Sequence, residues 1–170
     1  MSSTIGSASI NGSTISTSSI GFAPEEIDTS VTTRAARLKW VVVVNEELAP
    51  GLAVNAAICA AAATSAQVSG ILGPDAIDAD GSVHPGLPWV GCSVLAADTA
   101  TLRAIRAKAD AHPEIFVADM TDAAQQTRVY DEWITAVSET TADDVHYYAV
   151  SIVGPRNRVD RIVGRLPLLP

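Results

Sequence analysis

The stretch Lys39-Trp40-Val41-Val42-Val43-Val44 decides the fold of this chain. Residues 40–44 form an unbroken hydrophobic run that is rich in β-branched valine. Such a run is typical of a strand that is buried on both faces of a sheet, and sheets of this kind are covered by helices on both sides. We therefore expect residues 40–44 to lie in the middle of a mostly parallel sheet.

Helix and strand patterns alternate on both sides of this run. Helices are expected over 52–66, from a cap at Asp98 or Thr99 to residue 111, and over 157–164. A further helix is expected to begin at a Thr121 cap, with Val129, Trp133 and Val137 on one face. Strands are expected near 68–72 and over 90–96, 115–118 and 147–153, with 73–88 as a long loop. This order predicts an α/β fold, a three-layer α/β/α sandwich with a mixed, mostly parallel sheet.

The composition divides the chain into a tail and one domain. Residues 1–33 are rich in Ser and Thr and contain no Lys or Arg, so they are expected to form a flexible tail or an arm that docks on a partner subunit. Residues 34–170 are expected to form a single α/β domain.

Charge and hydrophobicity exclude several partners and compartments. The formal net charge of −8 disfavours nucleic acid, because an acidic surface repels phosphates. No apolar run is long enough to span a bilayer, and no basic residue precedes Arg34, so neither a membrane anchor nor a signal peptide is expected. Cys59 and Cys92 lie in apolar stretches, which favours reduced core thiols and a cytoplasmic location.

The familiar cofactor and metal motifs are absent from the sequence. The turn over 45–51 contains neither a dinucleotide-binding nor a P-loop glycine pattern. His84, His112 and His146 are far apart, which disfavours a zinc site. The segment 75–81 resembles part of a calcium loop but lacks oxygen ligands at its first and twelfth positions. We therefore expect no cofactor and no metal.

Polar residues at the expected strand ends indicate a site for a small molecule. Ligands of open α/β sheets bind beyond the carboxyl ends of strands, where helix N-termini point free N–H groups outward. The leading hypothesis is an enzyme that acts on a small polar metabolite or an amide-like bond. In this hypothesis Asp119 or His84 exchanges the proton and Asn55 holds an oxygen by hydrogen bonds.

Further residues are candidates for binding the substrate in the same site at the strand ends. These candidates are Lys39, Asn45, Gly51, Thr121 and Tyr130. Several candidate residues also have a purely structural interpretation: Asp119 as a helix cap, Asn55 as a partner of the neighbouring loop, His84 as an ordered loop residue, Lys39 as a solvated charge and Tyr130 as a core residue. Two alternative functions stay open, a non-catalytic small-ligand binding or regulatory module and a partner-binding subunit.

Three separated pieces resemble the fold of type II peptidyl-tRNA hydrolases. The pieces are residues 39–44 leading to Leu48 and Gly51, Phe116-Val117-Ala118-Asp119, and Ile152-Val153-Gly154-Pro155 followed by Val159-Asp160, Val163-Gly164 and Leu166-Pro167-Leu168. Those enzymes carry a lysine where this chain has Leu52, and an Asp-Ala-Gly-x-Thr-Gln motif where this chain reads Asp119-Met120-Thr121-Asp122-Ala123-Ala124-Gln125. These departures argue against peptidyl-tRNA hydrolysis.

A second resemblance is to an uncharacterised family of the same fold, catalogued as domain of unknown function two thousand. Its pattern is similar to Leu48-x-x-Gly51-x-x-x-Asn55-Ala56-Ala57, Gly73-Pro74-Asp75, Asp78-x-Asp80-Gly81, His84-Pro85-Gly86, Tyr130-Asp131 and Leu166-Pro167-Leu168. This resemblance implies a compact α/β sandwich that often forms homodimers, and it implies no established reaction.

Overall fold

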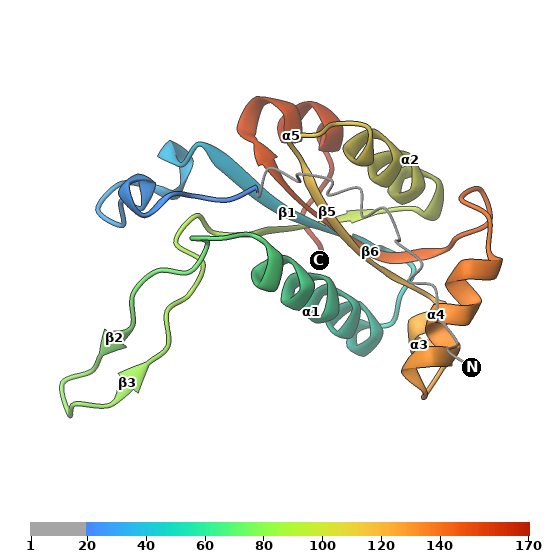
Figure 1. Cartoon of the computed structure of the whole chain (residues 1–170), viewed down its shortest axis with the longest axis horizontal. Helices are drawn as coiled ribbons and strands as arrows, with labels where there is room; N and C mark the ends of the chain where they lie inside the picture. The colour runs from blue at the N-terminus through green and yellow to red at the C-terminus, as the bar shows by residue number, and fades with distance from the viewer. Residues whose placement is uncertain (1–19) are drawn as a thin grey trace, which may run out of the picture.

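The computed structural model describes residues 20–170, and its centre is a four-stranded sheet in the order β4-β1-β6-β5 (Figure 1). The strands are β1 (Leu38–Asn45), β4 (Ser93–Ala97), β5 (Phe116–Thr121) and β6 (Tyr147–Pro155). β1 is parallel to β4, whereas β6 runs antiparallel to both β1 and β5. The sheet is mixed, as predicted, but the expectation of mostly parallel pairing is wrong. The helices between β5 and β6 stay at one end of the sheet, so the chain returns without the crossover that parallel pairing needs (Figure 1).

Strand β1 lies between β4 and β6, which confirms the prediction that residues 40–44 are central. Its side chains alternate between the two faces and are buried, except for Lys39, which is half-buried. Trp40, Val42 and Val44 pack in the same cluster as helix α1 (Pro50–Gln67). Val41 and Val43 pack on the other face with α2 (Thr99–Asp110) and α5 (Arg156–Val163). One helix layer therefore covers each face of the sheet.

Helix α1 approaches its face of the sheet closely because small residues line its inner side. Ala53, Ala56 and Ala60 are at most 4% exposed. One turn further along, Thr64 Oγ1 lies 2.7 Å from Ser151 Oγ of β6 and donates to the Ala60 carbonyl oxygen at 2.8 Å. The buried polar atoms at this contact are thus hydrogen-bonded, as a stable core requires.

The segment 73–88, expected to be a loop, contains a short hairpin that projects from the body of the molecule (Figure 1). Its strands are β2 (Ala76–Ile77) and β3 (Val83–His84), and we term residues 73–88 the arm. The tip is closed by Asp78, whose Oδ1 accepts hydrogen bonds from the backbone N–H groups of Asp80 and Ser82. The expected strand near 68–72 is replaced by two isolated bridges, at residues 69 and 72.

Two helices stand where one was predicted after β5. They are α3 (Ala123–Gln126) and α4 (Tyr130–Glu139). Thr121, the expected helix cap, is instead the last residue of β5, and Asp122 caps α3 by accepting from the Ala123 N–H at 2.7 Å. An Asp side chain competes well for free helix N–H groups, so the cap lies one residue later than expected.

The two ends of the described chain both pack on the domain. Short 3₁₀ helices, η1 (Pro24–Glu26) and η2 (Thr33–Ala35), precede β1. Phe22 is only 5% exposed and packs against Trp89 with 4.9 Å between ring centroids. The predicted tail lies outside the described residues up to residue 19. Ile20, Phe22 and Ile27 pack against the core, whereas residues 28–33 are exposed. At the other end, Leu168 bridges Leu95 and covers the free edge of β4.

Candidate functional site: a groove between α1 and α4

Three predicted site residues lie in separate parts of the molecule. Asn45 donates to Thr99 Oγ1 at 3.0 Å and accepts from the Glu47 N–H, so it joins the end of β1 to the start of α2. Lys39 lies at the opposite end of β1, where it forms an ion pair with Asp160 of α5. His84 lies on the arm, 3.4 Å from Asp78, far from α3 and α4 (Figure 1). The expected convergence of His84 on the strand ends is wrong, because the hairpin turns away from them.

Asn55 and Asp119 lie on opposite faces of the sheet, which corrects the expectation that both belong to one site beyond the strand ends. Asn55 Oδ1 accepts a 3.1 Å hydrogen bond from Gln125 Nε2 on the α1 side. Asp119 is aligned with Val150 of β6, whose side chain packs with α2, and its carboxylate binds Arg106 of α2 at 3.3 Å. Cross-strand partners share a face, so this register turns the Asp119 carboxylate away from α1.

A groove of about 550 Å³ runs between α1 and the segment that carries α3 and α4. One wall is formed by Cys59, Ala62 and Ala63 of α1. The rest of the lining comes from the β5 edge, from α3 and from the start of α4, and consists of Asp119, Met120, Ala124, Thr127, Arg128, Val129, Tyr130 and Trp133. The lining is mostly apolar with a few polar groups, which is the composition of small-molecule sites.

Two aromatic rings form the far wall of this groove. Tyr130 and Trp133 meet edge to face with 4.9 Å between ring centroids. Trp133 Nε1 donates to Thr121 Oγ1 at 3.2 Å, which fixes the indole on the end of β5. Tyr130 is 71% exposed, so the structure places it at the mouth and not in the core. The groove thus offers an aromatic face to a bound molecule.

The charges around the groove leave one cation at its mouth. Burial raises the pKa of the Asp119 carboxyl above its ordinary value, and the Arg106 guanidinium, which lies beside it, offsets part of this effect. Arg106 also binds Asp110 at 2.9 Å, so these groups balance one another on the α2 side. Arg128 is exposed, and none of the ion pairs within residues 20–170 involves it. A positive charge is therefore available to an anionic group.

Some groove residues were not predicted from the sequence. Cys59, Ala62 and Ala63 follow Asn55 at helical spacing on one side of α1, a signal that could have located this wall. Cys59 and Cys92 are unpaired but both are exposed, which corrects the expectation of core thiols. Arg128 lies between two short helices and had no sequence signal of its own.

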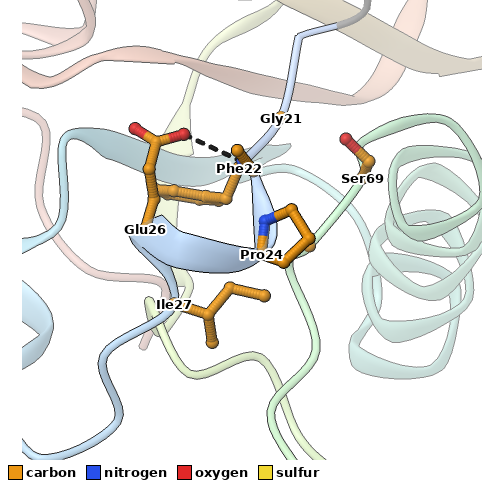
Figure 2. Close-up of a pocket in the computed structure, with 8 residues that line it drawn as sticks. Gly21, Phe22, Pro24, Glu26, Ile27 and Ser69 are labelled. Carbon is orange, nitrogen blue, oxygen red and sulfur yellow. Dashed lines mark hydrogen bonds between the residues drawn. The ribbon is translucent and has the colours of Figure 1, made fainter.

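A second hollow of about 590 Å³ lies between residues 21–27 and residues 69–70 (Figure 2). Figure 2 shows Pro24, Ile27 and Ser69 around it, with the Glu26 carboxylate turned to the backbone of its own turn. Glu26 is the one charged residue in its lining and is already paired with Arg37 at 2.7 Å. This hollow therefore offers less chemistry than the groove.

The described part of the chain contains neither a cluster of metal ligands nor a helix that could cross a membrane. Within residues 20–170, no three His, Cys, Asp or Glu side chains come together as metal ligands. Over the same range, none of the helices combines the length and the hydrophobicity needed to cross a bilayer. Of the predicted site residues, Tyr130 lines the groove, and Asp119 borders it from β5 although its carboxylate is bound to Arg106 on the other face of the sheet. Thr121 bonds the groove residue Trp133, and Asn55 lies one turn before the groove residue Cys59 on α1.

The fold and the groove define an α/β protein with a mixed four-stranded sheet and a small-molecule-sized recess beside the β5 edge. The chain belongs to the family described as protein of unknown function DUF2000, whose model matches residues 38–170. This match confirms the predicted family. The comparison with curated proteins found no match.

A solved structure has a similar fold. It is a protein of unknown function from Agrobacterium tumefaciens strain C58, with a TM-score of 0.72 and 21% sequence identity. The similarity covers 78% of this chain and 97% of that chain. At this identity the similarity establishes the fold alone.

Proposed function

We propose that the protein binds a small molecule in the groove between α1 and α4, and that this molecule combines an apolar body with one anionic group. The observation that carries the proposal is the position of Arg128, an exposed cation without an ion pair within residues 20–170, on the rim of an apolar recess. The volume of about 550 Å³ falls in the range of small-molecule sites. Tyr130 and Trp133 suit a flat or aliphatic body, and Arg128 suits a carboxylate or phosphate.

A binding module fits the geometry better than the acid/base enzyme of the leading hypothesis. General acid/base catalysis needs its groups within hydrogen-bond reach of one reacting centre. His84 lies on the arm, and the side chains of Asn55 and Asp119 lie on opposite faces of the sheet. We therefore assign no proton transfer to these three residues and favour the alternative without chemistry.

The resemblance to type II peptidyl-tRNA hydrolases enters this proposal as a fold resemblance only. Leu52, which stands where those enzymes carry lysine, is 45% exposed in the first turn of α1. An apolar side chain at this position and a net charge of −8 both disfavour tRNA as a ligand. We place the protein in the cytoplasm, because two exposed free thiols suit a reducing compartment.

A thermal-shift screen of carboxylates and phosphate esters tests the proposal, with each hit compared with its uncharged amide or alcohol analogue. We expect hits among the anions, because a ligand that binds only the folded state raises the melting temperature. Arg128→Gln should weaken binding of a hit by about tenfold to hundredfold, the effect of losing a hydrogen bond from a charged group. Ala63→Phe should abolish binding by filling the recess.

The matched control is Arg161→Gln, which removes an exposed arginine from α5 and should leave the affinity unchanged. Equal affinity in the wild type, Arg128→Gln and Ala63→Phe proteins would place the ligand elsewhere. Mass spectrometry of each hit after incubation distinguishes binding from conversion. Recovery of a product in catalytic amounts would restore the enzyme hypothesis and reject a module without chemistry.

A further inference from the structure

Helix α1 has an outer surface without charge. Its 18 residues include no Asp, Glu, Lys or Arg. Val54 and Ile58, one turn apart on the side away from the sheet, are 55% and 60% exposed. A helix at the surface of a soluble domain normally turns charged or polar side chains to water, and a helix that is apolar all round is normally buried. We term Val54 and Ile58 the outer α1 face, which is distinct from the groove wall at Cys59, Ala62 and Ala63.

The arm carries a second set of exposed apolar side chains. Ile77 and Val83 are directly opposite each other in the β2–β3 pair, so both side chains lie on one side of the hairpin. They are 71% and 61% exposed, and Leu87 near the root is 79% exposed. β2 and β3 pair only with each other among the described strands. A two-stranded hairpin of this kind is marginally stable in water by itself, so contact with another surface would stabilise it.

The root of the arm holds it in an extended position. The Gly73 N–H donates to the Leu87 carbonyl oxygen at 2.9 Å. The two strands are so close there that a Cβ at Gly86 would lie 1.9 Å from the Gly73 oxygen. The Gly86 N–H also donates to Asp75 at 2.9 Å. Figure 1 shows the arm leading away from the C-terminal end of α1 on the same side of the sheet as α1.

We propose that two copies of this chain form a symmetric dimer by arm exchange, in which the Ile77 and Val83 side of each arm packs on the outer α1 face of the other copy. Each chain carries both surfaces, the arm and the outer α1 face. When each arm packs on the other copy, the two contacts are equivalent and are related by two-fold symmetry. The outer α1 face carries no carboxylate, so it can accept an arm that contains Asp75, Asp78 and Asp80 and no Lys or Arg.

The area available is sufficient for a dimer. At about 1.5 Å per residue, α1 is about 27 Å long and, with side chains, about 10 Å wide. The 16 positions from 73 to 88 add a ribbon of similar length. At a similar width, each surface offers about 270 Å², so two reciprocal contacts bury roughly 1,000 Å² in total, which reaches the lower limit for a biological interface. The proposal concerns a surface separate from the groove and does not depend on the ligand.

Sedimentation of the full chain tests the proposal. We expect the wild type to be a dimer at micromolar concentration, and we expect Ile58→Glu and Ile77→Glu each to weaken association at least about tenfold. Both side chains are exposed, so both variants should keep the wild-type circular dichroism spectrum. Leu168→Glu changes a residue that is 69% exposed on the C-terminal segment, and it should leave the dimer intact.

Mixing the two variants tests the exchange itself. Ile58→Glu keeps an intact arm and Ile77→Glu keeps an intact outer α1 face, so their mixture retains one good contact of the two. The mixture should therefore form a heterodimer that associates more tightly than either variant alone. A monomeric wild type would overturn the proposal. So would a dimer that survives either substitution, or a mixture that associates no better than its components.

Discussion

The indole Nε1–H of Trp40 donates a 2.8 Å hydrogen bond to Ser151 Oγ in the centre of the molecule. Ser151 Oγ also lies 2.7 Å from Thr64 Oγ1, so one hydroxyl joins β1, β6 and α1. Trp40, Thr64 and Ser151 are all buried. A buried donor that loses its acceptor costs the free energy of its desolvation, whereas the intact network is satisfied.

Ser151→Ala should therefore lower the free energy of unfolding by about 1–3 kcal/mol, because the buried Trp40 N–H loses its acceptor. Urea unfolding measures the change, with the slope of free energy against urea expected to stay constant. Ser138→Ala is the matched control, since Ser138 is exposed on α4 and its loss should change stability by no more than about 0.5 kcal/mol. Equal stability of both variants would show that the network contributes nothing.

Two glycine substitutions should have opposite effects. Gly86→Ala forces its Cβ against the Gly73 carbonyl oxygen, so the root of the arm must open and the Gly73 amide should exchange faster with solvent.

Gly51→Ala adds a Cβ within α1 where no atom lies within 4 Å. It should stabilise the protein by about 0.5–1 kcal/mol, the usual helix difference between Ala and Gly. Hydrogen exchange and thermal unfolding measure the two effects.

Alkylation of Cys92 should depend steeply on pH. Cys92 is exposed at the surface, but the protein atoms around it remove much of the water from its sulfur, and this desolvation raises the pKa of the thiol to about 11. Only the thiolate reacts. In a Cys59→Ser background, the rate with iodoacetamide should rise about tenfold per pH unit from pH 8 towards 10, because the thiolate fraction does so below the pKa. Peptide mass spectrometry follows the reaction. A rate that levels off near pH 9 would contradict the raised pKa.

The pH dependence of stability should differ between the wild type and Asp119→Asn. Burial raises the pKa of the Asp119 carboxyl in the folded state above its unfolded value of 3.8. The folded state then binds this proton more tightly, so the stability that Asp119 contributes increases as the pH falls through the raised pKa towards 3.8. The wild type should gain stability relative to Asp119→Asn over that window in urea unfolding. A difference that is constant with pH would argue against the shift.

The elements that could be predicted from sequence have strong local signals. Helix α2 begins where Asp98 accepts from the Thr101 N–H at 2.7 Å and ends at residue 110, before Pro113, and both limits follow from cap and proline chemistry. The valine run of β1 was recognisable because hydrophobic burial on both faces leaves no polar position. The limits of α2 and the burial of β1 depend on residues that are close in the sequence, so both could be predicted.

The site was harder to predict because it depends on register and topology. The face that Asp119 presents is set by its alignment with Val150, and a shift of one residue would turn its carboxylate towards α1. The direction of β6 depends on a return at the end of the sheet, for which residues 122–146 give no local signal. Tyr130 looked like a core residue by type, yet it is 71% exposed, because α4 lies at the periphery of the domain and none of its residues is buried.

Strand β6 lies between β1 and β5, although it is the last of the four to be synthesised. Until it emerges from the ribosome, β5 has no partner strand, and the valine run of β1 lacks its cover on one edge. The nascent chain therefore keeps an open, highly apolar strand through most of translation, a state that favours aggregation. Cellular chaperones that shield such strands are expected to matter more for this protein than for one whose sheet is assembled in sequence order.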